Sequence, residues 1–140
     1  MDKTKLNKHF ILASSSKRRL ELLDQIGVKP DLILSPNIEE KILSKEPPRK
    51  YVERMSLEKN RVFQQEYFQS IILTADTVVS VGKRILPKAM DIKSAEECLK
   101  LISGRRHKVF TSFTLYTPNN SLKTKTIQSI IKFKRLHPDE

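Results

Sequence analysis

The chain is short of several residue types, and each shortage narrows the class of protein it can be. Its 140 residues include one cysteine, Cys98, so no disulfide can form within the chain. It has no tryptophan, and aromatic residues make up only 6% of the sequence. No apolar run approaches the roughly 18 residues of a membrane-spanning helix, so we expect no membrane partner. These shortages exclude a disulfide-stapled scaffold and favour a protein of the reducing cytoplasm.

Positive charge is in clear excess. Lys and Arg together number 27 against 16 Asp and Glu, which gives a net charge of +11 and a pI near 9.9. Such a charge suggests a polyanionic partner, but the cations are spread along the chain, so general lysine enrichment explains it equally well. A face for single-stranded nucleic acid would interleave aromatic residues with cations. Phe113, Tyr116 and Phe133 are too few and too scattered for that, so we do not expect nucleic acid as a partner.

The segment 10–26 breaks a local rule of helix chemistry. Residues 10–13 predict a short apolar strand, and the helix that follows repeats apolar residues at helical spacing, at Leu20, Leu23 and Ile26. Between them lie three serines, of which Ser16 is the expected N-cap. The three cations 17–19 then occupy the first helical turn, where the helix dipole favours acidic side chains. A bound phosphate would explain these cations, and a basic surface turn is the alternative.

A second helix is predicted to begin at Pro47 and Pro48, because proline suits the first turn of a helix. One face of this helix is apolar and carries Tyr51, Val52, Met55, Val62 and Phe63. Lys59 falls on the same face. Its side chain either runs along the edge of the apolar stripe into solvent or faces a partner or cavity.

Residues 71–81 form the most apolar and β-branched stretch, which predicts a buried strand or strand pair. Asp76 lies in its middle. A buried carboxylate is costly unless it is paired, hydrogen-bonded or bound to metal. Asp76 therefore either caps a turn between two strands or faces a polar cleft.

The remaining elements are shorter. Residues 31–35 predict a strand. Asp91 or Ser94 is the expected cap of a third helix, and Ser94 with Glu97 fits a capping box. Residues 108–116 and 124–133 predict the two strands of a hairpin. Strands that alternate with helices and end in a hairpin predict an α/β fold, with a mixed β-sheet flanked by helices.

Six short segments occur in the order and approximate spacing of motifs of the Maf family, and they extend over almost the whole chain. The segment 12–23 resembles that family's opening L-A-S-x-S-P-R-R-x-E-L-L, and the segment 75–79 matches A-D-T-V-V. Four others resemble I-D-E, E-K-A, I-L-G-K-P and S-G-R-x-H-x-V-x-T, and they lie at 38–40, 58–59, 85–88 and 103–111. The chain is therefore similar to Maf-like proteins, which implies a Maf/ITPase-like architecture.

The resemblance implies a nucleoside triphosphate pyrophosphatase. Such an enzyme hydrolyses a ribo- or deoxyribonucleoside triphosphate to the monophosphate and pyrophosphate, with a divalent metal cation, Mg²⁺ or Mn²⁺. The A-D-T sequence at 75–77 suits a substrate such as dTTP or UTP. A modified nucleotide such as 7-methyl-GTP stays open as an alternative substrate. A homodimer stays open as well.

The resemblance also implies roles for particular residues. Asp76 would accept a proton from the attacking water, directly or through metal, and Glu40 with Asp76 would bind the metal. The residues that would bind the substrate are Ser14, Arg18, Arg19, Lys59, Thr77 and Lys88. Among these, Arg18 and Thr77 occupy the family positions that bear on the choice of base.

The sequence departs from the family pattern at three places. Lys17 stands where the family has proline, and Pro87 and Ala89 flank Lys88 where the family has glycine and proline. Family members also continue beyond the last matched segment. We therefore expect residues 1–140 to form a single Maf-like α/β domain that lacks the C-terminal third of the family. A catalytically impaired nucleotide-binding remnant is the alternative to an active enzyme.

Overall fold

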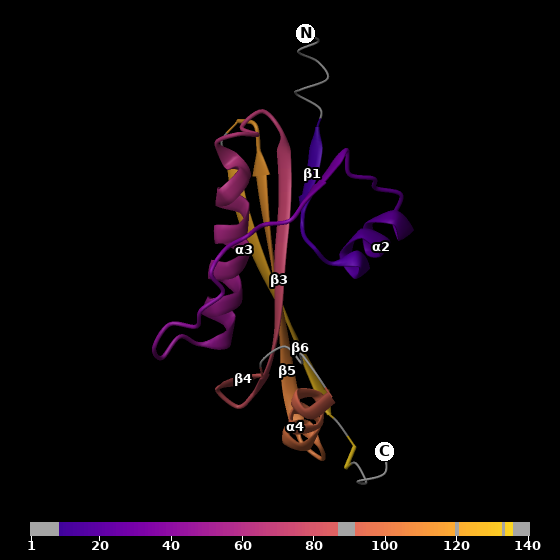
Figure 1. Ribbon diagram of the computed structural model, residues 1–140, viewed down its shortest axis with the longest axis vertical. Helices are drawn as coiled ribbons and strands as arrows, with labels where there is room; N and C mark the ends of the chain where they lie inside the picture. The colour runs from indigo at the N-terminus through magenta and orange to yellow at the C-terminus, as the bar shows by residue number, and fades with distance from the viewer. Residues whose placement is uncertain (1–8, 87–91, 120, 133, 136–140) are drawn as a thin grey trace.

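The computed structural model describes residues 9–86, 92–119, 121–132 and 134–135. Its elements follow one another along the chain as shown in Figure 1. They are β1 (Phe10–Ala13), α2 (Lys17–Gln25), β2 (Leu32–Leu34), α3 (Pro48–Gln64), β3 (Ile71–Val81), β4 (Arg84–Leu86), α4 (Ile92–Ile102), β5 (Arg106–Thr117) and β6 (Ser121–Lys132).

Within the described ranges the strands form one mixed sheet of six strands. Its order is β2-β1-β3-β5-β6, and β4 pairs with one end of β3. β1 runs parallel to β2 and β3, whereas the pairs of β3 with β4, β3 with β5 and β5 with β6 are antiparallel. The predicted α/β fold, the strand near 31–35 and the final hairpin are therefore confirmed.

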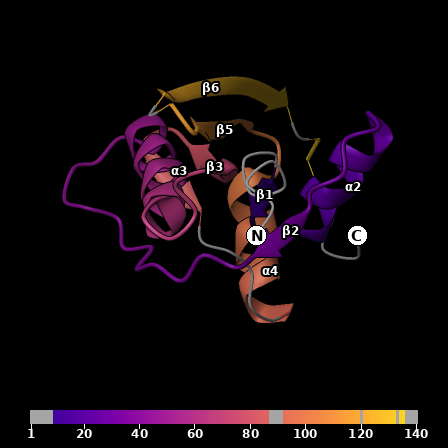
Figure 2. The ribbon, with the colours of Figure 1, turned by 90° about the horizontal axis from the view of Figure 1, so that it is seen from above.

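The helices lie on both faces of this sheet. α3 runs along one face and α2 lies on the opposite side of β1 and β3 (Figures 1 and 2). α3 begins at Pro48 as expected, and its buried side chains Tyr51, Val52 and Met55 pack against Val78 and Phe110 of the sheet. This layer of side chains positions the middle of α3 directly over the middle of β3.

The apolar stripe predicted for α3 is wrong at one position. Val62 is 47% exposed, whereas the polar residues Ser56 and Asn60 are fully buried. Ser56 Oγ lies 3.1 Å from the hydroxyl of Ser112 and 2.8 Å from that of Thr114, and Asn60 Nδ2 donates to the Thr114 carbonyl at 3.1 Å. These hydrogen bonds satisfy the polar groups of Ser56 and Asn60, so both side chains can be buried between α3 and the sheet.

The starts of the other two helices differ in how well the sequence predicted them. Ser16 is the N-cap of α2, with its Oγ accepting from the Arg19 N–H at 3.3 Å, as predicted. α4 begins at Ile92, so Ser94 lies inside the helix. The capping box predicted at Ser94 is therefore wrong, because an N-cap has to precede the first helical residue. The alternative cap, Asp91, lies outside the described residues.

Candidate functional site

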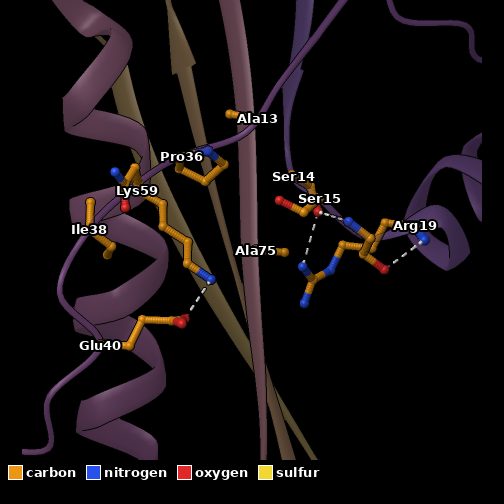
Figure 3. Close-up of a pocket in the computed structure, with 11 residues that line it drawn as sticks. Ala13, Ser14, Ser15, Arg19, Pro36, Ile38, Glu40, Lys59 and Ala75 are labelled. Carbon is orange, nitrogen blue, oxygen red and sulfur yellow. Dashed lines mark hydrogen bonds and ion pairs between the residues drawn. The ribbon is translucent and has the colours of Figure 1, made fainter. Parts of the chain in front are cut away.

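A polar pocket of about 340 Å³ lies beside β3, close to the end of β1. Its walls come from the serine loop after β1, the first turn of α2, the segment after β2, and single side chains of α3 and β3. The lining residues are Ala13, Ser14, Ser15, Ser16, Arg19, Pro36, Asn37, Ile38, Glu40, Lys59 and Ala75. Segments far apart in the sequence therefore meet at this pocket (Figure 3).

Arg19 is held on one side of the pocket by hydroxyl groups. Its Nη1 donates to Ser14 Oγ at 3.2 Å and its Nη2 donates to Thr77 Oγ1 at 3.4 Å. Thr77 Oγ1 lies in turn 3.0 Å from Thr111 Oγ1. Burial lowers the pKa of the Arg19 guanidinium, and the negative charge of Asp76 partly offsets this. Within the described part of the chain Arg19 forms no ion pair, so its charge is available to an anion.

Lys59 enters the pocket from α3, on the other side of β3 from Arg19 (Figure 3). Its Nζ lies 2.9 Å from Asp76 Oδ1 and 3.2 Å from Glu40 Oε1. Lys59 is 9% exposed and Asp76 4% exposed. The interpretation of Lys59 as a side chain reaching into solvent is therefore wrong, because two carboxylates hold its ammonium group inside.

Asp76 lies in the middle of one continuous strand, opposite Ser112 of β5. The interpretation of Asp76 as a turn residue is therefore wrong. The ion pair with Lys59 offsets the cost of burying its carboxylate, so the strand does not need to break.

The structure brings together most of the side chains that the sequence predicted. Four of them, Ser14, Arg19, Glu40 and Lys59, line the pocket, while Asp76 and Thr77 contact two of these four. Arg18 is exposed on α2 and is not a lining residue. Lys88 lies outside the described residues.

Some residues at the site carry no signal in the sequence that identifies them. Asn37 adds a polar group to the pocket wall. Tyr51, predicted only as an apolar residue of α3, donates its hydroxyl to the Glu40 carbonyl at 2.7 Å. Asn37 lies far from the serine loop in the sequence, and both reach one pocket in the fold in which β1 and β2 are paired.

The carboxylates of Glu40 and Asp76 fit a hard divalent cation, although they share the Lys59 ammonium group. Mg²⁺ is commonly bound by one or two carboxylates, with water and substrate phosphates completing its shell. The described residues contain no group of three His, Cys, Asp or Glu side chains that could hold a metal alone. The donor set therefore suits a cation that arrives with a phosphate substrate.

No helix in the described ranges is both long enough and apolar enough to cross a membrane.

Comparison with protein families and with curated relatives gives concordant results. The family model described as Maf-like protein matches residues 9–140. A nucleoside triphosphate pyrophosphatase of Ehrlichia chaffeensis is 49% identical over 132 residues, which cover 94% of this chain and 69% of that protein. A dTTP/UTP pyrophosphatase of Wolbachia sp. subsp. Drosophila simulans is 47% identical over 133 residues, which cover 94% of this chain and 67% of that protein. The chain thus spans about two thirds of the length of these relatives.

Solved structures with a similar fold are more distant in sequence. The Ham1 protein of Staphylococcus aureus matches with a TM-score of 0.62 at 12% identity, over 89% of this chain and 71% of that one. A nucleoside-triphosphatase, described also as a dITP/XTP pyrophosphatase, of Mycobacterium abscessus matches with a TM-score of 0.57 at 16% identity. That match covers 92% of this chain and 75% of the other. At such identities the likeness concerns the fold alone.

Proposed function

The chain belongs to the Maf-like protein family, and from this premise we propose that it is a nucleoside triphosphate pyrophosphatase. One observation carries the proposal. Two cationic side chains, Arg19 and Lys59, face a single polar pocket from opposite sides of β3, and the buried carboxylate of Asp76 contacts one of them. The relatives named nucleoside triphosphate pyrophosphatase and dTTP/UTP pyrophosphatase support the same activity.

The serine loop and the first turn of α2 bind phosphate in this proposal. α2 has no acidic residue in its first turn, so no carboxylate there offsets the partial positive charge of the helix N-terminus, where Ser16 and Arg19 line the pocket. Arg19 adds a planar guanidinium group that forms two hydrogen bonds with phosphate oxygens. Ser14 Oγ fixes that guanidinium and the turn together, since it accepts hydrogen bonds from both Arg19 and the Ser16 N–H.

Asp76 and Lys59 carry out the proton and charge chemistry. A water molecule attacks the α-phosphorus, the bond to the bridging oxygen breaks, and the products are a nucleoside monophosphate and pyrophosphate. Asp76 accepts the proton that the water loses, as a positioned general base. Lys59 orients the Asp76 carboxylate through Oδ1 and neutralises negative charge that develops on the phosphates.

Glu40 and Asp76 are the residues that would hold Mg²⁺ or Mn²⁺ in this site. When bound, such a cation would polarise the phosphoryl oxygens and lower the pKa of a coordinated water. Among the described residues no group of three His, Cys, Asp or Glu side chains could hold a metal, so substrate phosphates and water would complete its ligands.

We propose dTTP or UTP as the substrate class, by analogy with the relatives of that name. The Thr77 hydroxyl accepts a hydrogen bond from the Arg19 guanidinium, which places Thr77 beside the pocket. This position is the support that Thr77 gives to the choice of substrate. The exposed position of Arg18 leaves its role in base choice as a prediction. A cytoplasmic location stays a prediction too.

The products of nucleotide hydrolysis test the proposed function. The purified chain is incubated with dTTP, UTP, dATP, dGTP, dCTP or 7-methyl-GTP, with Mg²⁺, with Mn²⁺ or with EDTA, and the products are separated by chromatography. We expect a monophosphate and pyrophosphate, formed only with metal. A diphosphate with inorganic phosphate would refute the proposed bond cleavage. Binding of nucleotide without any product would establish the impaired remnant instead.

A further inference from the structure

Glu40 reaches the pocket on a segment that is neither helix nor strand, between β2 and α3. We propose that Tyr51 and Arg54 are positioning residues that hold this segment, 40–46, on α3 and so keep the Glu40 carboxylate beside Lys59. The catalytic importance of placing the Glu40 carboxylate beside Lys59 rests on the proposed function. The placement itself is a structural claim and can be tested without any activity.

The contact between Glu40 and Lys59 is too weak to hold the segment alone. The Glu40 side chain is 42% exposed, and an ion pair with so accessible a partner contributes little to stability. A loop of this length also loses much conformational entropy when it is fixed in one place. Some stronger set of contacts therefore has to hold the backbone.

Tyr51 supplies the first contact. Its hydroxyl donates to the Glu40 carbonyl at 2.7 Å, and its ring is buried against Met55 and Phe110. Burial raises the pKa of Tyr51 to about 12, so the hydroxyl keeps the proton that it donates. Because the ring is locked in the core, this hydrogen bond ties the backbone of Glu40 to a rigid point.

Arg54 supplies the second contact, one helical turn further along. Its Nη2 donates to the Lys41 carbonyl at 2.7 Å, and its guanidinium group bonds both oxygens of Glu46 at 2.7 and 2.8 Å. Glu46 in turn accepts the Leu43 N–H at 3.1 Å. The guanidinium carbon also lies 5.7 Å from the centre of the Tyr51 ring, within cation–π range. The two anchors therefore act as one unit on both ends of the segment.

The arrangement makes α3 the common support for three functional positions. The helix carries Lys59 and also carries both anchors of the segment that bears Glu40. A site held on one regular element is more precise than a site held by loops. The separation between the Glu40 carboxylate and the Lys59 ammonium group is therefore set by α3 rather than by the loop itself.

Two tyrosines allow a matched test. Tyr116, also buried, donates its hydroxyl to the Phe68 carbonyl at 2.9 Å, in a loop away from the pocket. Tyr51→Phe and Tyr116→Phe each remove a hydroxyl that donates to a backbone carbonyl and keep the ring. We expect both to lower the melting temperature by a similar few degrees. Only Tyr51→Phe should lower kcat/KM for nucleotide hydrolysis, by roughly 10-fold or more, as supporting contacts behind metal ligands commonly do.

Arg54→Lys and Glu40→Gln separate positioning from general stability. Arg54→Lys keeps the positive charge but loses the planar guanidinium group that hydrogen-bonds Lys41 and Glu46 together. It should therefore lower kcat/KM as Tyr51→Phe does. In a Glu40→Gln background, Tyr51→Phe should cause no further loss of kcat/KM, because the group that it positions is already gone. An equal loss of kcat/KM in Tyr51→Phe and Tyr116→Phe, or a full additional loss in the Glu40→Gln background, would overturn the proposal.

Hydrogen exchange tests the position independently of any activity. Backbone amides of residues 40–46 should exchange faster in Tyr51→Phe and Arg54→Lys than in the wild-type chain, and should be unchanged in Tyr116→Phe. If the wild-type chain hydrolyses no nucleotide, the proposed function fails, and this measurement alone decides the proposal. Unchanged exchange at 40–46 in both variants would overturn it.

Discussion

Replacing Lys59 by methionine isolates the energetic role of the buried ion pair. Methionine has a similar length and fills the space of the lysine stem, so packing against the neighbouring side chains is largely kept. The change leaves Asp76, which is 4% exposed, without the ammonium group that lies 2.9 Å from its Oδ1. The variant should therefore be destabilised through charge rather than through a cavity.

The distances set the size of the effect. Two unit charges about 3 Å apart interact by roughly 5 kcal/mol at an effective dielectric constant near 20. Removing one partner of a buried pair typically costs about 3–5 kcal/mol, because the other charge stays buried. The Glu40 contact adds less than about 1 kcal/mol, since that carboxylate is accessible to solvent. We therefore expect Lys59→Met to lower the free energy of unfolding by about 3–5 kcal/mol at pH 7.

Urea denaturation of four proteins measures this prediction. They are the wild-type chain, Lys59→Met, the double variant Lys59→Met/Asp76→Asn, and the control Lys50→Met, which removes an exposed lysine from the same helix. The double variant should recover about 2–3 kcal/mol of the loss, because no charge is then left buried. Lys50→Met should stay within about 0.5 kcal/mol of wild type. A double variant no more stable than Lys59→Met alone would refute the ion-pair reasoning.

Two further predictions concern the pocket and the segment beside it. Arg19→Gln should weaken binding of a nonhydrolysable triphosphate analogue roughly 10–100-fold, from the loss of charge-assisted hydrogen bonds, in calorimetric titrations at fixed salt. Arg84→Gln, at an exposed position with no predicted role, should weaken binding far less, and an equal loss in Arg19→Gln and Arg84→Gln would mean that general basic charge, not the pocket, binds the triphosphate. The pKa of Glu46 lies below its ordinary value of 4.5, chiefly because Arg54 donates hydrogen bonds to its carboxylate. The stability that Glu46 contributes is therefore fully present above pH 4.5 and is lost as the pH falls through the lowered pKa. The melting-temperature difference between wild type and Glu46→Gln should therefore shrink between pH 6 and pH 3, and a constant difference would contradict this.

The sequence predicted the parts of the fold that depend on local patterns. Alternating and continuous apolar runs predicted the strands, and the serines before three cations predicted the start of α2 at Lys17. The buried polar positions of α3 could not be predicted in this way. Ser56 and Asn60 are buried because hydroxyl and carbonyl groups of β3 and β5 lie opposite them, and that fact depends on strand pairing.

The site was predicted chiefly by resemblance rather than by residue chemistry. Taken alone, Asp76 suggested a turn more readily than a cleft, because nothing local shows that Lys59 lies across from it. Residue patterns also gave no indication of Tyr51 or Arg54, whose roles arise from contacts with the segment 40–46. The expected lack of a C-terminal third stays a prediction, as do the roles of Arg18 and Lys88.

Pyrophosphate release by the wild-type chain and by Asp76→Asn, measured with dTTP and UTP in saturating Mg²⁺, tests the central claim most directly. Asparagine keeps the shape of the side chain but cannot accept a proton from water. We predict metal-dependent pyrophosphate release by the wild-type chain and a fall of about 10²–10⁴-fold in turnover by the variant, with nucleotide binding largely kept. Equal metal-dependent rates in the two proteins would contradict the role of Asp76 as the catalytic base.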